Sequence, residues 1–171
     1  MKKGFTLIEL IISFGIFMIV ISGLMGALIS TVKLQRNMID NQKMIEEVSY
    51  ALEYMTRAIR MAKKDSNGYN YTLSGGNTLI FLNSDDKIQS FRFNYEDNSI
   101  EVRISPDTGF LPLTSSAVKI TQLSFSNAGS SWNSSGNDQT KVAILITAES
   151  RSGSTIRFQT TISQRRLNTK I

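Results

Sequence analysis

The pattern of hydrophobic and polar positions divides the chain into three stretches, and the first of them is almost wholly apolar. Between Phe5 and Val32 the chain has no proline, and its only charged residue is Glu9. At about 1.5 Å of rise per residue, a helix of this length spans the roughly 30 Å hydrocarbon core of a bilayer. A carboxylate inside such a helix is costly and by default marks a functional position with a partner. We therefore expect a membrane-spanning helix in which Glu9 has a function.

The second stretch, residues 33–65, has the period of an amphipathic helix. Its apolar positions recur at steps of three, four or seven and comprise Met38, Ile45, Val48, Leu52, Met55, Ile59 and Ala62. This spacing predicts one apolar face on a helix that continues to Lys64, with Lys63 and Lys64 complementing its C-terminus before a break at residues 65–68. We expect this face to pack on the protein's own sheet rather than in a coiled coil. Opposite charges four residues apart predict the ion pairs Arg36/Asp40, Lys43/Glu47 and Glu53/Arg57.

The third stretch has the period of two that is typical of strands. A short extended piece is expected at 69–73, and strands are expected at 78–83, 88–95, 100–104, 118–126, 141–147 and 156–162. A slip of phase within 118–126 predicts a bulge, and the unbroken apolar run at 141–147 predicts a central strand. Loops are expected at 106–112 and in the Ser/Gly/Asn-rich segment 127–139. The predicted fold class is α+β, with a long N-terminal helix packed on an antiparallel sheet.

Composition narrows the chemistry that this fold can support. The chain of 171 residues has no cysteine and no histidine, so it lacks disulfides and the commonest general base and metal ligand. No motif pairs a nucleophile with a base, and we expect neither an enzyme nor a cofactor. The formal charge of +5 falls to +3 (5 − 2) once Lys2 and Lys3 are set aside. This excess is modest, and we do not expect nucleic acid to be a partner.

The residues Gly4-Phe5-Thr6-Leu7-Ile8-Glu9-Leu10 resemble the processing motif of type IV pilins and of the related pseudopilins of type II secretion. The resemblance implies that a membrane prepilin peptidase cuts between Gly4 and Phe5 and methylates the new amine of Phe5. It also implies that Glu9 pairs with the Phe5 amine of a neighbouring subunit in the filament. Lys2 and Lys3 would hold the leader on the cytoplasmic side.

The same resemblance implies a division of the chain and a set of partners. Residues 1–4 would be the cleaved leader, 5–32 the transmembrane and filament-core helix, 33–65 its amphipathic continuation, and 66–171 an antiparallel β-sheet head. The protein would cross the inner (cytoplasmic) membrane once, with its head outside the cytoplasm, before it enters a pilus or pseudopilus. Expected partners are other pilin or pseudopilin subunits, the prepilin peptidase, the inner-membrane assembly platform and membrane lipid.

Two further segments look most like minor pilins and the J class of minor pseudopilins. They are A-L-E-Y-M-T-R-A-I-R-M-A, residues 51–62, and F-Q-T-T-I-S-Q-R-R-L, residues 158–167. This likeness implies a minor, initiating or tip-proximal subunit, while the machine stays open between secretion, motility and competence. The alternative function is a membrane-anchored binding module or adhesin that uses the helix only as a tether.

Three glycines in the apolar helix, Gly15, Gly23 and Gly26, are candidates for close helix packing. Glycine is also simply tolerated in membrane helices, and both interpretations stay open.

Other polar or aromatic groups are better explained without a site. The pairs Asp85-Asp86, Glu96-Asp97 and Asn137-Asp138 lack the spacing of a calcium loop and suit turns, so no metal is expected. Trp132 is either an exposed partner anchor or a satellite core residue, and we favour the latter. The basic residues Arg151, Arg157, Arg165, Arg166 and Lys170 are expected on a solvated face rather than on DNA.

Overall fold

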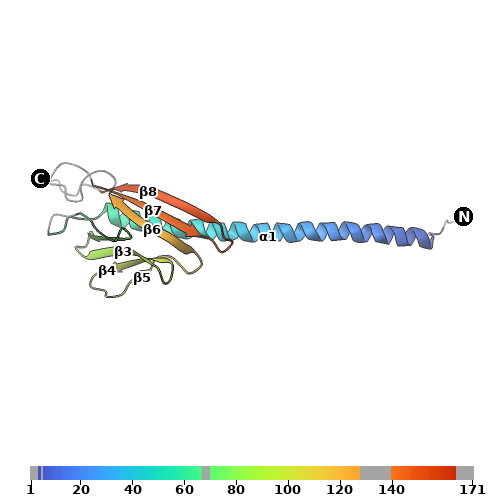
Figure 1. Cartoon of the computed structure of the whole chain (residues 1–171), viewed down its shortest axis with the longest axis horizontal. Coiled ribbons are helices and arrows are strands. Elements are labelled where there is room, and N and C mark those ends of the chain that lie inside the picture. The colour runs from blue at the N-terminus through green and yellow to red at the C-terminus, as the bar shows by residue number, and fades with distance from the viewer. Residues whose placement is uncertain (1–3, 5, 67–69, 128–139, 165–171) are drawn as a thin grey trace. The chain divides into compact units, whose positions relative to one another are not determined.

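A computed structural model describes residues 4, 6–66, 70–127 and 140–164 of the chain. Within these residues the chain forms one helix and eight strands, drawn in Figure 1. The elements are α1 Leu7–Arg60, β1 Thr72–Ser74, β2 Thr78–Leu82, β3 Ile88–Asn94, β4 Ser99–Ile104, β5 Leu111–Pro112, β6 Lys119–Asn127, β7 Lys141–Glu149 and β8 Thr155–Ser163. The chain divides into two compact units, Met1–Ile39 and Asp40–Ile171.

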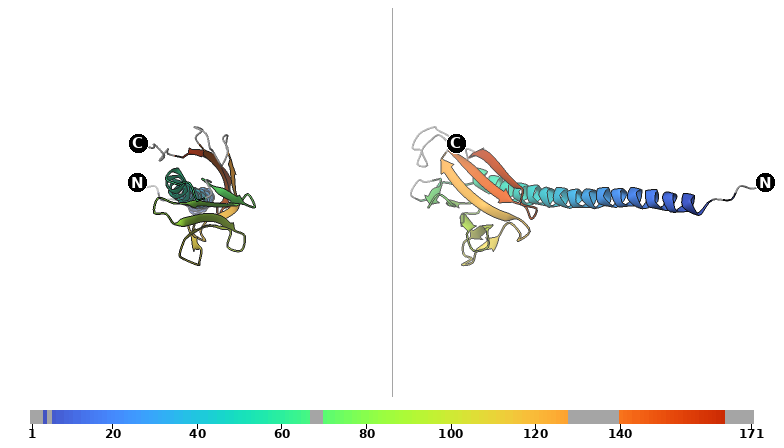
Figure 2. Two further views of the ribbon diagram at one scale, coloured as in Figure 1. Left: turned by 90° about the vertical axis from the view of Figure 1, so that its left-hand side faces the viewer. Right: turned by 45° about the vertical axis from the view of Figure 1, so that its right-hand side comes forward.

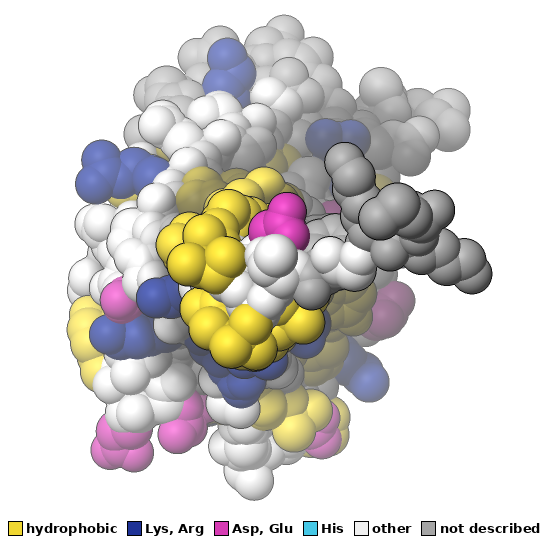
Figure 3. Space-filling view, turned by 90° about the vertical axis from the view of Figure 1, so that its right-hand side faces the viewer, with side chains coloured by type: hydrophobic (Ala, Val, Ile, Leu, Met, Phe, Trp, Pro, Cys, Tyr) yellow, Lys and Arg dark blue, Asp and Glu magenta, His cyan; other side chains and the backbone are white. Residues whose placement is uncertain are grey.

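The first unit contains the N-terminal part of α1, and its apolar side chains are exposed. Hydrophobic side chains cover this part of the helix in Figure 3, and their exposed fractions include 77% at Leu7 and 61% at Leu28. Among the described residues, α1 is the one helix long and apolar enough to cross a membrane, with a mean hydropathy of 2.5 in its most apolar window. A surface of this kind is unsuited to water and suited to lipid or to other helices.

In the second unit, one face of α1 enters the core, although not with all the residues expected. Its buried residues are Met44, Val48, Ala51, Met55 and Ile59. The predicted face was therefore right at Val48, Met55 and Ile59 but wrong at Met38 and Ile45, which are 59% and 43% exposed. A step of one residue rotates a helix by about 100°, so burial of Met44 turns Ile45 away from the same core.

Helix α1 ends at Arg60, and the prediction that it continues to Lys64 was wrong. Lys63 instead forms a β-bridge with Leu82, and its N–H donates to the Leu82 carbonyl at 2.8 Å. The Tyr71 hydroxyl donates to the Ile59 carbonyl at 2.8 Å, and the Gln164 amide donates to the Ala62 carbonyl. These donors satisfy carbonyls that the end of a helix leaves without intrahelical partners.

One of the three predicted helix-surface ion pairs forms among the described residues. Arg57 and Glu53 are 3.0 Å apart, whereas Lys43 and Glu47 are not paired in this part of the chain. Arg36 and Asp40 belong to different units, and their pairing stays a prediction. Glu47 instead accepts hydrogen bonds from the backbone N–H of Ser115 at 2.9 Å and from its hydroxyl. The carboxylate therefore links the helix to the chain that leaves β5.

The strands form two antiparallel sheets where a single sheet was expected. The first has the order β1-β2-β3-β4-β5 and the second the order β6-β7-β8, so β7 is central as predicted. The register of β6 against β7 shifts between Ile120 and Gln122, which confirms the bulge. Strand β5 lies in the segment expected as a loop. The sheets are joined by hydrogen bonds from Ile120 N–H to the Asn98 carbonyl and from Phe125 N–H to the Gly76 carbonyl, both 2.8 Å.

The core of the second unit lies where α1 meets both sheets, whose strands curve around the C-terminal part of the helix in Figure 2. Phe91 of β3 is fully buried and contacts Tyr54 of α1 edge to face, with ring centroids 6.1 Å apart. It also contacts Phe81 of β2, at 5.8 Å. The predicted α+β class, a long N-terminal helix packed against antiparallel strands, is therefore confirmed.

Candidate processing and assembly site

The start of α1 is organised by a reciprocal pair of hydrogen bonds between Thr6 and Glu9. The Thr6 hydroxyl accepts from the Glu9 backbone N–H at 3.4 Å, and Glu9 Oε2 accepts from the Thr6 backbone N–H at 3.2 Å. The Thr6 hydroxyl also donates to the same Oε2 at 3.1 Å. This is a capping box, in which the N-cap residue and the third helical residue satisfy each other's backbone donors.

The capping box explains why helix α1 starts at Leu7 rather than at Phe5. It also places a carboxylate in the first turn, where the helix dipole favours negative charge. The sequence carries the signal for this cap, because T-x-x-E before an apolar run is the signature of a capping box. Both bonds to the carboxylate fall on Oε2, so within the described residues Oε1 is open to another donor.

Three hydroxyl groups farther along the apolar helix are satisfied by its own backbone. Ser22 donates to the Met18 carbonyl at 2.8 Å, Ser30 to the Gly26 carbonyl at 3.0 Å and Thr31 to the Ala27 carbonyl at 2.9 Å. Such bonds to the preceding turn remove the need for outside partners in an apolar medium. The Glu9 carboxylate is thus the one group in this span that calls for a cation.

The glycines of the apolar helix lie on open surface. A Cβ atom added at Gly15, Gly23 or Gly26 would meet nothing within 4 Å. The backbone at these three positions is accessible to another helix, and whether one packs there stays a prediction. Gly4 precedes the helix and is likewise exposed and free of close neighbours. Phe5, the second residue of the predicted processing site, lies outside the described residues.

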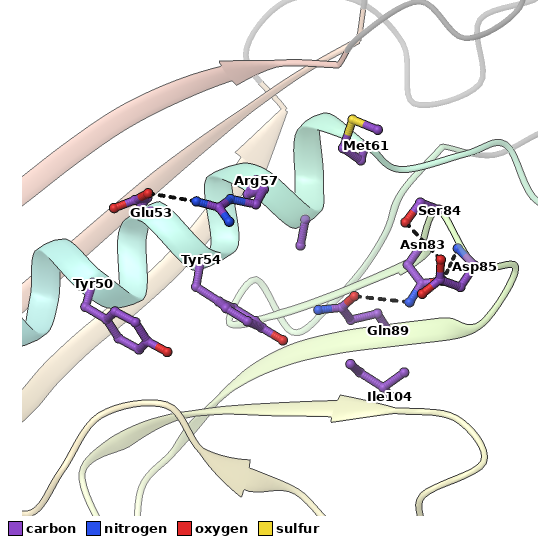
Figure 4. Close-up of a pocket in the computed structure, with 11 residues that line it drawn as sticks. Tyr50, Glu53, Tyr54, Arg57, Met61, Asn83, Ser84, Asp85, Gln89 and Ile104 are labelled. Atoms are coloured by element: carbon purple, nitrogen blue, oxygen red, sulfur yellow. Dashed lines mark hydrogen bonds and ion pairs between the residues drawn. The ribbon is translucent and has the colours of Figure 1, made fainter.

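The second unit has a groove that the sequence did not predict. It is about 490 Å³ in volume and lies between the C-terminal turns of α1 and the β2–β3 turn, as Figure 4 shows. Tyr50 and Tyr54 line it on the helix side, and the hydrogen-bonded side chains of Asn83 and Gln89 on the sheet side. The lining also includes the carboxylates of Glu53 and Asp85, and the Ser84 hydroxyl donates to Asp85 Oδ1 at 3.4 Å.

The other candidate groups are dispersed. Asp86 is held by Lys63 at 2.8 Å and has a φ of 59° in the β2–β3 turn, in keeping with a turn role. Among the described residues there is no cluster of three or more His, Cys, Asp or Glu that could hold a metal. Arg151 and Arg157 are exposed, on the β7–β8 turn and on β8. The remaining candidates lie outside the described residues, namely Trp132, Asn137-Asp138, Arg165, Arg166 and Lys170.

Comparison with known proteins identifies the first part of the chain. Residues 1–25 match the model of a family described as the prokaryotic N-terminal methylation motif. No curated protein and no solved structure matches the chain. The matched segment contains Gly4, the Thr6–Glu9 capping box and the apolar helix as far as residue 25. Proteins that carry this motif are substrates of a prepilin peptidase. Together with the apolar helix, the motif indicates a membrane or pilus location.

The motif and the fold lead to the same identification. A methylation motif stands at the start of a long apolar helix, and the C-terminal turns of that helix pack on antiparallel sheets. The chain is therefore a type IV pilin-like protein, with a structural rather than an enzymatic role.

Proposed function

We propose that the chain is a structural subunit of a type IV pilus or a type II secretion pseudopilus. A prepilin peptidase removes residues 1–4 and methylates the amine of Phe5. The mature protein then leaves the inner membrane and packs its helix among those of neighbouring pilin or pseudopilin subunits. Residues 5–32 form the filament core, 33–65 the amphipathic continuation, and 66–171 the head outside the cytoplasm.

The observation that carries this proposal is the hydrogen bonding of the Glu9 carboxylate. It is the only charge between Phe5 and Val32; one of its oxygens accepts from Thr6, and the other has no donor among the residues that the structure describes. A neighbour's Phe5 amine supplies the missing cation. A buried pair of this kind is strongly destabilised when either partner is removed. It therefore selects the axial register in which every carboxylate meets an amine.

The structure also supports cleavage after Gly4. This residue is exposed, precedes the helix and has no close neighbours. Glycine suits a peptidase cleft because it has no Cβ. Lys2 and Lys3 keep the leader on the cytoplasmic face, where the peptidase and the assembly platform act.

Within the filament we propose a minor, initiating or tip-proximal subunit, on the likeness of residues 51–62 and 158–167 to minor pilins and J-class pseudopilins. The exposed groove beside Tyr50 and Tyr54 suits a subunit whose head makes contacts of its own.

Mass spectrometry of the N-terminus of the protein purified from its natural host tests the proposal. We expect loss of residues 1–4 and one added methyl group on Phe5. Gly4→Val should block the cleavage, and Gly26→Val, the same change C-terminal to the matched residues 1–25, should not. An intact Met1, or a cut C-terminal to Val20, would instead support the tethered module or a secreted protein.

A further inference from the structure

Two cations follow the apolar span of α1 directly, and neither has a partner within the described residues. Lys33 and Arg36 are the first charged residues after Glu9. Both are exposed. Residues 33–39 contain no acidic side chain. The two positive charges are therefore available to an external anion.

The position of these cations matches the thickness of a membrane. Glu9 and Lys33 are 24 residues apart on one helix, which is about 36 Å at 1.5 Å per residue. The hydrocarbon core is roughly 30 Å thick. When Lys33 reaches the headgroups of the outer leaflet, Glu9 therefore lies at the opposite interface rather than in hydrocarbon. The flexible stems of Lys33 and Arg36 can bring their charges to the headgroups while Leu34 stays against the acyl chains.

We propose that Lys33 and Arg36 bind the phosphate groups of anionic phospholipids in the outer leaflet and thereby set the depth of α1 in the membrane. The guanidinium of Arg36 can donate two parallel hydrogen bonds to a phosphate, and the ammonium of Lys33 adds a second positive charge one turn away. Their spacing of three residues puts both on neighbouring positions of one helix face. In the sequence the next acidic residue is Asp40, four positions after Arg36.

This inference rests on the proposed membrane insertion, and it adds a step to assembly. The contacts of Lys33 and Arg36 with lipid phosphates have to break before the subunit moves outward. The same movement carries Glu9 into hydrocarbon, where a neighbour's amine becomes its partner. Release from the lipid and formation of the charge pair are therefore coupled by the fixed length of the helix.

The test measures which lipids surround the helix. The full-length chain is reconstituted in phosphatidylcholine nanodiscs with and without phosphatidylglycerol, and spin-labelled lipids report its preference for the anionic lipid. Since each cation near the surface contributes about fivefold to binding, we expect Lys33→Gln with Arg36→Gln to remove most of the preference. Raised salt should weaken the wild-type preference in the same direction.

The matched control is Arg151→Gln with Arg157→Gln, which removes two exposed positive charges from the second unit. It should keep the preference. An unchanged preference in the Lys33/Arg36 variant, or an equal loss in the control, would overturn the proposal. Competition by inorganic phosphate at constant ionic strength would mean a site for free anions instead of lipid, and would also overturn it. The measurement involves neither cleavage nor assembly, so its failure would leave the proposed processing of Gly4 and the role of Glu9 standing.

Discussion

Replacing Thr6 with valine removes one hydroxyl group from the start of α1 and leaves the shape of the side chain nearly unchanged. In the structure this hydroxyl accepts from the Glu9 backbone N–H at 3.4 Å and donates to Glu9 Oε2 at 3.1 Å. The bond from the Thr6 backbone N–H to Oε2 remains. The substitution therefore removes the N-cap and half of the restraint on the carboxylate while it adds no bulk.

The expected size of the effect follows from the geometry of the cap. Loss of an N-cap hydroxyl costs about 1 kcal/mol, which corresponds to about a fivefold change in the opening equilibrium of the first turn. We therefore expect the Glu9 amide of Thr6→Val to exchange its hydrogen about five times faster, as measured by NMR on the full chain in detergent micelles. We also expect a smaller share of the processed protein in filaments, because the Glu9 carboxylate is less well oriented towards an incoming amine.

Thr6→Ser is the matched control, since it retains the hydroxyl and loses only a methyl group. Serine caps helices as well as threonine does. The Ser variant should exchange and assemble like the wild type. Equal exchange rates at Glu9 in the Val and Ser variants would refute the capping box. Faster exchange at Glu9 together with undiminished assembly of the Val variant would refute the role of the cap in orienting Glu9.

Four further outcomes follow from the structure. Glu9→Ala should still be cleaved and methylated but should be depleted from filaments, as quantified by immunoblotting of sheared and cellular fractions; normal abundance in filaments would contradict the charge pair. Phe91→Ala should lower the free energy of unfolding of the second unit by about 3–5 kcal/mol in thermal denaturation, because the ring is fully buried between two aromatic neighbours. Glu47→Gln should cost about 1 kcal/mol in the same assay, since it weakens two charge-assisted bonds, whereas Glu46→Gln should change little, because the exposed Glu46 carboxylate accepts from Gln42 on the same helix. Burial raises the pKa of Tyr71 above the usual value of 10.0, so folding stability from this group is complete below pH 10 and declines as the pH rises further; Tyr71→Phe should remove that part of the alkaline decline.

Much of the fold could be predicted from the sequence because local periodicity coincides with burial. Alternation between polar and apolar residues located the strands, and the slip of phase before Leu123 located the bulge that the register confirms. The edges of elements were less predictable. The end of α1 depends on Leu82, which is distant in sequence and offers a carbonyl to the Lys63 backbone. The division into two sheets likewise depends on pairing that no local pattern records.

In the candidate site, likewise, the features formed by neighbouring residues were predictable and those formed by residues distant in sequence were not. Gly4, Phe5 and Glu9 form a compact motif, and residues 1–25 match the corresponding family. The capping role of Thr6 was also predictable, because its spacing to Glu9 is that of a capping box. The groove beside Tyr50 and Tyr54 could not be foreseen, because it combines helix positions with a turn more than twenty residues later in the chain.

Hydrogen bonds from several parts of the second unit hold the chain at the C-terminal end of α1, and this has a mechanical consequence. The Ile59 and Ala62 carbonyls and the Lys63 backbone are bonded to Tyr71, Gln164 and Leu82 respectively, and these partners come from separate parts of the second unit. A force applied along the helix is therefore shared by these three hydrogen bonds, instead of acting on the bonds between one strand and its neighbour. Tension on a subunit should be borne collectively by the whole head, which is a useful property for a protein pulled by one end.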